Sequence, residues 1–414
     1  MHYQSHKYIM LHDLANVIEK TPRCELSMDK VSTWSALNRI AAHDVVTTMD
    51  VPYRARAAYD GFALYSMDTP GKLRLIGSVR VGEIPTFSVK RGEAVYVTTG
   101  AYLPDGVDAV VPEEEAELID NQVLITNKVT SGANIDPVGS YLVSGSKVIE
   151  KGDIIMGHVI PALMEAGIME LDVYERPAVS IISTGSELVK PISAPDAMQA
   201  FLGGKTLEST GSLISWFIVS YMPYLSIAEH RLVNDDLESI RSVMLDALKK
   251  SNIVVTTGGS GPSDIDYLGE AVSSLGPKWM VRGLKMRPGR PTTVAAMEDC
   301  KLIFGLSGHP ISALNALINV IEPMVKIMLG IHKSPAKPIV KGRLTRNVTV
   351  EPDMITQIRV KATRRNGELL VTPLGGGSSV TTSLATTDGL VTLTSPAREG
   401  DVVDVFLIQD PGDS

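Results

Sequence analysis

The chain contains 414 residues and carries a formal net charge of −8 at pH 7, with 44% hydrophobic and 21% charged residues. This length exceeds that of one ordinary hydrophobic core and predicts two to four domains. The negative charge argues against broad electrostatic binding to nucleic acid or to an anionic membrane surface. An anionic small molecule remains a suitable ligand, because local arginines and backbone amides can bind it within an acidic protein.

Cysteine content and hydropathy indicate a cytoplasmic location. Cys24 and Cys300 are the two cysteines of the chain, which excludes a disulfide framework and zinc-finger spacing. The N-terminus has no apolar core of a signal peptide, and the apolar stretch 154–173 is interrupted by charged residues and proline. We therefore expect a cytoplasmic protein that does not associate with membranes.

The first part of the chain predicts a small domain with an insertion. Residues 8–20 and 27–42 have helical patterns, the second with a Ser or Asp cap at its start. Residues 49–137 contain short apolar or alternating runs separated by turns, which predict a β-rich inserted domain. This insertion would interrupt a discontinuous N-terminal or linker domain made of residues 8–48 and 138–176.

Residues 177–332 predict a central α/β domain. Apolar, β-branched runs there end in a small polar residue and glycine, and each precedes a segment with a helical pattern; they cover 179–185, 253–259 and 302–308. Uninterrupted apolar runs are typical of strands buried on both faces of a parallel-type sheet. Alternating strands then predict a C-terminal β-barrel-like domain over 338–410. The expected fold is therefore multidomain, α/β plus β.

Each strand–glycine–helix unit would place backbone amides at the same edge of the sheet, where open α/β folds bind anions and nucleotides. The first unit carries Glu187 just after Gly185. Glu187 could serve there as a metal ligand or as an acid or base. The motif alone is explained as well by a helix start with a favourable acidic charge.

The second unit is richer in glycine and acid. Successive amides in its loop could form a concave anion-binding nest, with contributions from Gly258, Gly259, Ser260 and Ser263. Asp264 and Asp266 follow, and carboxylates of this kind hold Mg²⁺ next to substrate phosphates. A flexible turn before an acidic helix start is the simpler alternative, but the glycine density favours a binding role.

The third unit and a nearby turn provide further candidates for anion binding. Free amides of the helix that begins near Pro310 would face the same crevice, together with Ser307, Gly308, His309 and Ser312. Arg287 and Arg290 lie on a Pro-Gly turn, and guanidinium groups suit phosphate-like oxyanions. A solvated turn and a merely hydrogen-bonded histidine are the alternatives.

These segments occur in the same order as the motifs of a known family. The matching stretches are Ala57–Ala63, Thr98–Val111, Gly132–Tyr141, Ser183–Leu188, Gly258–Asp266, Arg287–Pro291 and Gly305–Ala313. They resemble, respectively, the family patterns SAMDGYA, MTGAxxPxGxDAVV, GxNIRxxGED, STGDEL, GGVSVGDxD, KPGKP and GLPGNPVSA. Over nearly its whole length the chain thus resembles the molybdopterin molybdenumtransferase family, the enzyme type to which the gephyrin E domain also belongs.

The resemblance implies an enzyme of molybdenum cofactor biosynthesis that inserts molybdate, or tungstate, into adenylylated molybdopterin and releases AMP with the help of Mg²⁺. It further implies an elongated homodimer, with a site between the α/β domain of one subunit and the Asp60 and Thr99 segments of the other. The adenylyltransferase of the same pathway is a further partner that it suggests. The pterin supplies its own dithiolene sulfurs, so the protein needs no cysteine ligands.

The resemblance also assigns roles to individual residues. The catalytic carboxylates would be Asp60, Glu187 and Asp266, and the metal ligands would be Glu187, Asp264 and Asp266. The substrate-binding residues would be Thr99, Gly258, Gly259, Ser260, Ser263, Arg287, Arg290, Ser307, Gly308, His309, Ser312 and Arg359. Among these, the three arginines would bind the oxygens of molybdate or phosphate.

This chain departs from the family patterns at several positions of the expected site. The substitutions are Ser186 for Asp, Asp136 for Arg, Ser140-Tyr141 for Glu-Asp, Ser307 and His309 for Pro and Asn, and Glu208-Ser209-Thr210 for Asp-Ser-Asn. Two alternative functions follow, a non-catalytic pterin-binding scaffold and a molybdopterin adenylyltransferase. The β-rich insertion and the C-terminal β domain argue against the adenylyltransferase, which does not need them.

Overall fold

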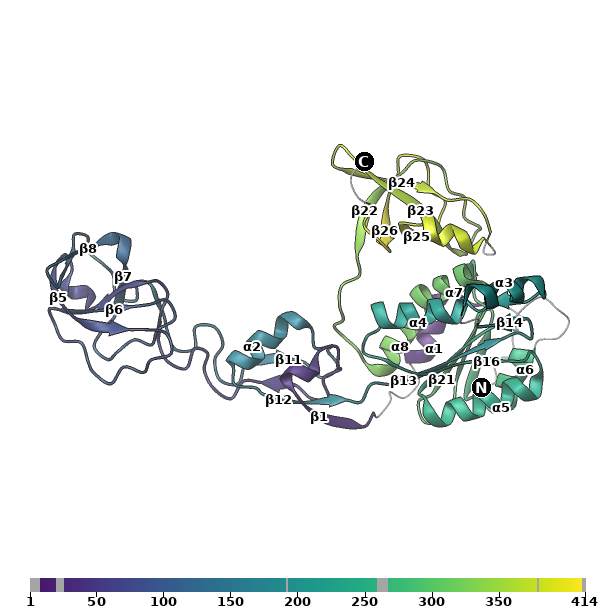
Figure 1. Ribbon diagram of the computed structural model, residues 1–414, viewed down its shortest axis with the longest axis horizontal. Helices are drawn as coiled ribbons and strands as arrows, with labels where there is room; N and C mark the ends of the chain where they lie inside the picture. The colour runs from purple at the N-terminus through teal and green to yellow at the C-terminus, as the bar shows by residue number, and fades with distance from the viewer. Residues whose placement is uncertain (1–7, 20–25, 191–192, 259–266, 378–379, 412–414) are drawn as a thin grey trace.

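The computed structural model describes residues 8–19, 26–190, 193–258, 267–377 and 380–411. The molecule is elongated (Figure 1). A β-rich domain forms one end, a small linking domain follows, and the α/β domain lies at the other end with the C-terminal β domain beside it. The α/β domain is therefore far from the β-rich domain of the same chain.

The N-terminal segment contains one predicted helix and one wrong prediction. Helix α1 (Leu11–Glu19) forms as expected and buries Leu14 and Ile18 in the α/β core. The helix predicted over 27–42 does not form, because β1 (Met28–Ser32) pairs antiparallel with β12 (Glu170–Tyr174) and a 3-10 helix follows over Thr33–Ala36. Hydrogen bonds to a strand about 140 residues away thus outweigh the local helical pattern.

The linking domain is small and built from short pairs of strands. Helix α2 (Ile160–Glu165) packs on its core. The other elements are β2 (Val45–Val46) paired with β11 (Lys147–Ile149), and β3 (Arg56–Ala57) paired with β10 (Ile135–Asp136).

A β-rich domain forms in this part of the chain, as the fold class predicted. A six-stranded sheet has the order β7-β4-β6-β5-β9-β8. Its strands are β4 (Gly61–Leu64), β5 (Gly71–Val79), β6 (Glu93–Val97), β7 (Ala109–Pro112), β8 (Ala116–Ile119) and β9 (Gln122–Ile125). Both faces of this sheet are covered by apolar side chains, which form two small cores.

The α/β domain contains a six-stranded sheet of order β16-β13-β17-β21-β20-β18. Its first four strands are parallel, as predicted: β16 (Ser226–Val233), β13 (Ala178–Thr184), β17 (Ile253–Thr257) and β21 (Leu302–Leu306). Strands β20 (Thr293–Ala296) and β18 (Trp279–Arg282) add an antiparallel edge that the sequence analysis did not predict.

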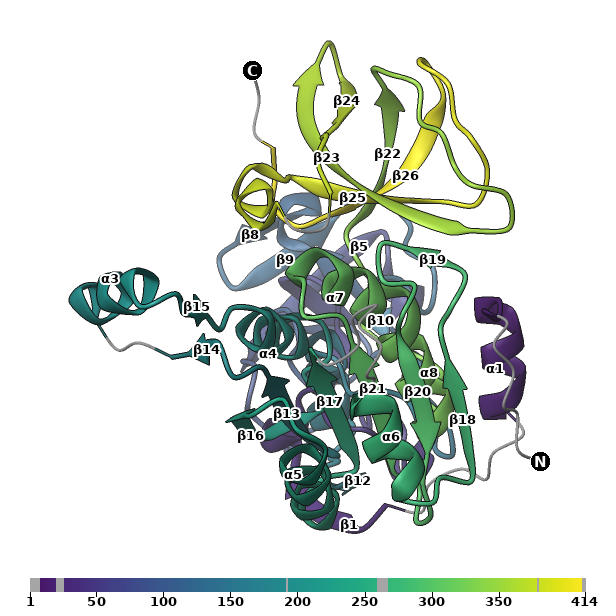
Figure 2. The same ribbon diagram turned by 90° about the vertical axis from the view of Figure 1, so that its right-hand side faces the viewer.

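Helices cover both faces of this sheet (Figure 2). Ile181 of β13 packs with α4 (Thr210–Tyr221) and α7 (Pro310–Ala316), whereas its neighbour Ile182 packs with α5 (Leu237–Lys250) and α6 (Tyr267–Ser274). Successive strand residues point to opposite faces. Burial on both faces therefore explains why the strand sequences are apolar without interruption.

Two features complete the α/β domain. A ribbon of β14 (Leu188–Val189) and β15 (Thr206–Leu207) carries α3 (Ala194–Leu202) away from the domain (Figure 2). Helix α7 continues through a π-helical turn into α8 (Glu322–Leu329). The resulting stretch Pro310–Leu329 has the length and apolarity of a membrane span, but most of it is buried, as in the core helix of a globular domain.

The predicted C-terminal barrel is confirmed. Pairing of β23 with β25 closes the order β23-β24-β22-β26-β25 into a ring, and β19 (Met286–Arg287) of the preceding domain pairs with β23. The strands are β22 (Ile339–Leu344), β23 (Ile355–Arg365), β24 (Glu368–Pro373), β25 (Gly389–Leu393) and β26 (Val402–Leu407), and a 3-10 helix spans Thr381–Thr386. The β19–β23 pairing attaches the barrel to the turn that carries the two arginines.

The buried carboxylate of Asp388 stabilises this barrel through its hydrogen bonds, and replacing it tests that contribution. Its carboxylate is buried and accepts hydrogen bonds from the Ala362 N–H (2.8 Å), Lys361 Nζ (3.0 Å) and Gln409 Nε2 (2.8 Å). Burial alone would raise the pKa of Asp388, but these donors outweigh it and hold the pKa below its ordinary value. We expect Asp388→Asn to lower the free energy of unfolding at pH 7 by about 1.5–3 kcal/mol.

The pH dependence of this loss follows from the lowered pKa. The ionised carboxylate contributes stability above its unfolded pKa, and this contribution disappears as the pH falls through the folded value. Urea denaturation should therefore separate D388N from the wild type at pH 7 and much less at pH 3. Asp404→Asn removes an exposed carboxylate of the same barrel and serves as the control; an equal loss in both variants would contradict the prediction.

Candidate active site at the carboxyl ends of the parallel strands

The four parallel strands of the α/β domain end at one pocket of ≈ 350 Å³. Each strand contributes lining residues at or just after its carboxyl end: Thr184 and Gly185 from β13, Asp235 after β16, Thr257 and Gly258 from β17, and Gly308 and His309 after β21. The chain crosses from one side of β13 to the other between β16 and β17. Ligand sites of open α/β folds lie at such a switch point.

The glycines bring the strand ends close together. Gly258 has a φ of +91°, and a Cβ there would lie 2.7 Å from Thr184 Oγ1 and collide with the Thr184 carbonyl oxygen. A Cβ on Gly308 would lie 3.6 Å from the Gly258 Cα. The three predicted glycine turns therefore converge on the same pocket, because backbone packs against backbone without side chains between them.

Glu187 and Asp235 form an acidic part of this pocket. The Glu187 side chain folds over Gly185, where a Cβ would be 2.6 Å from Oε1. Burial and the negative charges of Glu187 and Asp236 raise the pKa of Asp235. Asp235 was not among the predicted site residues, although its place two residues after the end of β16 was the available signal. The pair makes this part of the pocket acidic and suited to a cation.

The turn after β21 forms the opposite wall. His309 occupies the N-cap position of α7, and its Nδ1 lies 3.2 Å from Ser307 Oγ. Thr210 Oγ1 of α4 donates to the Gly308 carbonyl oxygen at 2.6 Å. Ser312, which lies on α7, is buried. The first turns of α4 and α7 are thus joined next to the pocket, and the amide end of α7 can interact with an anion.

Arg287 and Arg290 do not line this pocket. Both guanidinium groups bind Glu351, which precedes β23; Arg290 Nη2 lies 3.1 Å from Oε2, and Arg287 contacts Oε1. Their turn is attached to α7, because Asn315 Nδ2 donates to the Pro288 carbonyl oxygen at 2.5 Å. The two arginines therefore form an exposed cationic pair at the junction between the α/β domain and the barrel.

Arg359 lies apart from these groups, inside the barrel. Its side chain is buried, and the guanidinium group donates to the carbonyl oxygens of Gly375 (3.3 Å), Gly376 (2.8 Å) and Val380 (3.4 Å) and contacts Ser383 Oγ. Burial lowers the pKa of Arg359. These contacts assign Arg359 to the support of the Gly375–Gly376 loop, and a substrate would have to displace them.

Asp60 and Thr99 are paired in the β-rich domain. Asp60 Oδ1 accepts hydrogen bonds from the Thr99 N–H (2.6 Å) and Thr99 Oγ1 (2.7 Å), and these bonds hold the pKa of Asp60 below its ordinary value. The pair is exposed at the start of β4. The β-rich domain that carries the pair lies at the far end of the molecule from the α/β domain of the same chain (Figure 1).

Comparisons with known proteins decide the family. Three family models match: the MoeA N-terminal region (domain I and II) over residues 6–167, a probable molybdopterin binding domain over 180–327, and the MoeA C-terminal region (domain IV) over 341–408. A molybdopterin molybdenumtransferase of Staphylococcus aureus (strain MRSA252) is 32% identical over 390 residues, which covers 92% of this chain and 91% of that protein. The chain belongs to the molybdopterin molybdenumtransferase family.

Further members agree with this assignment. A molybdopterin molybdenumtransferase of Staphylococcus epidermidis is 29% identical over 385 residues and is matched over 90% of both chains. A solved structure of the molybdopterin biosynthesis MoeA protein from Pyrococcus horikosii has 28% sequence identity, a TM-score of 0.75, and coverage of 98% of this chain and 100% of that one. The pocket described above lies within the part that matches the probable molybdopterin binding domain.

Some residues expected from the family patterns lie outside the described part of the chain. They are Gly259, Ser260, Ser263, Asp264 and Asp266. The described residues 258 and 267 flank this stretch, and Gly258 lines the pocket. Within the described residues no group of three or more His, Cys, Asp or Glu side chains is arranged to hold a metal ion.

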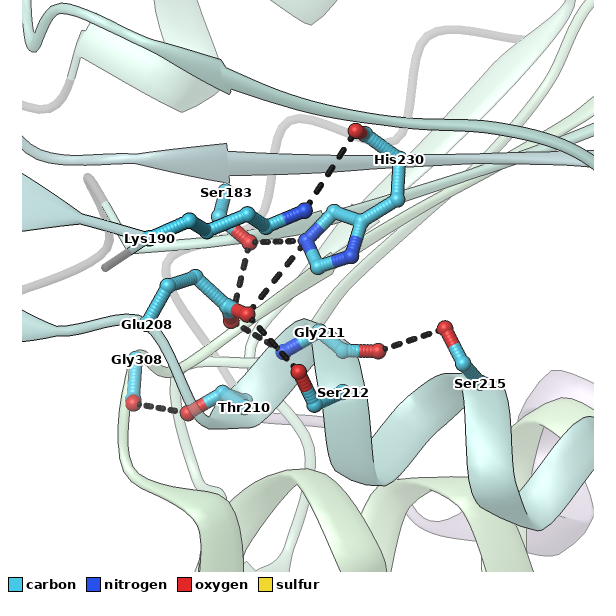
Figure 3. A network of polar contacts seen from close by, with 9 residues as sticks. All are labelled: Ser183, Lys190, Glu208, Thr210, Gly211, Ser212, Ser215, His230 and Gly308. Atoms are coloured by element: carbon cyan, nitrogen blue, oxygen red, sulfur yellow. Dashed lines mark hydrogen bonds and ion pairs between the residues drawn. The ribbon is translucent and has the colours of Figure 1, made fainter. Parts of the chain in front are cut away.

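The structure adds two further residues to the predicted pocket, although Glu208 was already visible as a departure from the family pattern. Glu208 lines the pocket at the start of α4, and Thr381 reaches it from the C-terminal barrel. Glu208 also belongs to a buried network with Ser183 and His230 (Figure 3). The position of Glu208 before a helix start was visible in the sequence, but its contacts with Ser183 on β13 and His230 on β16 were not.

Proposed function

We propose that this protein inserts molybdate, or tungstate, into adenylylated molybdopterin and releases AMP in a Mg²⁺-dependent reaction. The observation that carries the proposal is the convergence of four parallel strand ends on one pocket within the match to the probable molybdopterin binding domain. Relatives of this family are named molybdopterin molybdenumtransferase. Backbone amides at Gly258, Gly308 and the start of α7 suit the phosphate groups of such a substrate.

The donors in the pocket fit a magnesium ion. Glu187 and Asp235 supply carboxylate oxygens, which hard cations prefer, and their mutual repulsion contributes to the raised pKa of Asp235. We assign Glu187, Asp264 and Asp266 as metal ligands, and we assign catalytic roles to Glu187, Asp266 and Asp60. A bound Mg²⁺ would polarise the phosphoanhydride of the substrate. The chain itself orients the phosphates through the glycine turns.

We propose that Arg287 and Arg290 bind the oxyanion substrate, molybdate or tungstate. Both guanidinium groups already bind one carboxylate, that of Glu351. A carboxylate is a planar oxyanion, so the same donors can bind the oxygens of molybdate. Arg359 is left out of this set, because its donors are directed to carbonyl oxygens of its own barrel.

This assignment predicts that Glu351 competes with the oxyanion. Glu351→Gln is expected to raise the affinity for tungstate about two- to fivefold, a range set by the small strength of exposed ion pairs. Isothermal titration of the full chain with tungstate at low salt measures the change. Asp353→Asn removes a nearby charge that lies 3.9 Å from Lys285 Nζ and controls for general electrostatics; an equal gain in both variants would refute the competition.

We further propose that a homodimer completes the site. Asp60 and Thr99 lie far from the α/β pocket of their own chain, so a second copy would have to supply them. Light scattering on the purified protein tests this state directly, and mixtures of Asp60→Ala and Asp266→Ala subunits should regain activity at mixed interfaces. We also propose a cytoplasmic location, in agreement with the scarcity of cysteine.

The decisive experiment mixes purified protein with adenylylated molybdopterin, molybdate and Mg²⁺ and measures AMP by chromatography. We expect AMP release by the wild type and its loss in Asp266→Ala with the dimer retained. Absence of AMP release next to an active family member would refute the enzyme and favour the pterin-binding scaffold.

A further inference from the structure

A buried polar network connects the start of α4 to strands β13 and β16 (Figure 3). At its centre is the Glu208 carboxylate, whose side chain is 1% exposed. It accepts hydrogen bonds from the Gly211 N–H and from Ser212 Oγ (3.2 Å) at the helix start. From the sheet side, Ser183 Oγ lies 3.2 Å from Oε1, and His230 Nε2 lies 3.5 Å from Oε2.

Glu208 replaces the usual helix cap. Ser209 occupies the N-cap position of α4 but makes no side-chain cap hydrogen bond. The carboxylate of Glu208 takes over this role, and its negative charge suits the amide end of a helix. The first turn of α4 is therefore attached to the sheet through Glu208.

Gly211 allows the imidazole of His230 to pack against this turn. A Cβ at Gly211 would lie 2.9 Å from Ser183 Oγ and would collide with His230 Nε2. His230 is thus enclosed between the helix start and β13, and its side chain is 13% exposed. Glu208, Gly211 and His230 pack together as one unit, because Gly211 has no side chain that would collide with the imidazole of His230.

The ring of His230 suits this position in its neutral form. Burial lowers the pKa of His230; the Glu208 carboxylate opposes this effect and the Lys190 ammonium adds to it. A neutral ring places no positive charge at the amide end of α4, and its Nε2 stays in polar contact with the Glu208 carboxylate, 3.5 Å away. Ser183 Oγ, 3.1 Å from Nε2, shares this contact.

The unit of Glu208, Gly211 and His230 is connected to the pocket through the residues at the start of α4. Glu208, Ser209 and Thr210 line the pocket, and Thr210 donates to the Gly308 carbonyl oxygen. A displacement of the first turn of α4 would therefore move the wall formed by Gly308 and His309. We propose that Glu208 and His230 are positioning residues, which hold this wall in the arrangement that binds the anionic substrate. The identity of that substrate rests on the proposed function.

Kinetics of AMP release test the proposal in the full chain. We expect Glu208→Gln and His230→Leu to raise the KM for adenylylated molybdopterin about fivefold, in line with the loss of a helix cap, and to change kcat less than twofold. His230→Gln retains a donor near Nε2 and should restore a KM close to that of the wild type. Glu229→Gln, which removes a neighbouring half-buried carboxylate of β16 paired with Arg231, is the matched control.

Hydrogen exchange supplies a readout that needs no substrate. Peptides covering 303–313 should exchange faster in E208Q and H230L than in the wild type, and not in E229Q. An unchanged exchange rate in this segment, or a KM shift equal to that of E229Q, would overturn the proposal. If the wild type releases no AMP, the proposed function fails, whereas the exchange comparison still decides whether the pair positions the pocket wall.

Discussion

Replacement of Glu187 by glutamine is expected to lower the rate of AMP release at least about 100-fold, the loss typical of a charged catalytic group. Glu187 follows β13 and folds over Gly185 into the pocket at the carboxyl ends of the parallel strands. Glutamine preserves the shape of the side chain and removes the charge that a hard cation needs. The same change removes one cause of the raised pKa of Asp235, which should move toward its ordinary value.

The measurement is AMP release at saturating and at limiting Mg²⁺. Partial recovery of E187Q at high Mg²⁺ is expected, because the remaining ligands would bind the ion more weakly. Glu238→Gln on α5, whose side chain is 81% exposed, is the control for the loss of one negative charge. An E187Q enzyme with more than about half of the wild-type rate would contradict the role of Glu187 as metal ligand.

The second large effect is expected at Gly258. Gly258→Ala should lower the free energy of unfolding by about 2–5 kcal/mol, the combined cost of a positive φ and of overpacking. It should also abolish AMP release. The reason is geometric, because a Cβ there meets the backbone carbonyl of Thr184, which cannot rotate away as a side chain would. The three turns that form the pocket would be forced apart.

Gly276 provides a matched control for backbone strain. It also has a positive φ, +68°, but a Cβ there meets no atom within 4 Å. Gly276→Ala should therefore lose only about 1–2 kcal/mol and keep its activity. Chemical denaturation of both variants measures the difference. Equal losses would show that backbone strain explains the whole effect and that close packing of the turns is unimportant.

Where the structure agreed with the sequence, the signal was local and strong. Strand β17 (Ile253–Thr257) forms within the predicted run 253–259, because its residues are apolar or β-branched and are buried on both faces. The helix predicted over 27–42 failed for the opposite reason. Its helical pattern is local, and the strand pairing with Glu170–Tyr174 decided the outcome.

The residues of the candidate site likewise divide into those that the local sequence predicted and those that the tertiary structure decided. Glu187, Gly258, Gly308 and His309 were predictable, because each lies within about three residues of the end of a buried strand and the ends of parallel strands meet at one edge. Arg359 was assigned from a family pattern, and its burial among carbonyl oxygens became visible only in the folded barrel. Motif matching reports residue types, whereas the direction of a side chain depends on its surroundings.

The amino-acid sequence by itself determined the strand–glycine–helix units, the β-rich insertion, the C-terminal barrel and the family, because hydrophobic periodicity and turn residues act over a few positions. Only the tertiary structure decided which distant groups share a site. It brought Glu208 to His230, attached the arginine turn to Glu351, and separated Asp60 from the pocket of its own chain. These contacts join residues that are far apart along the chain, and no local pattern encodes such a distance.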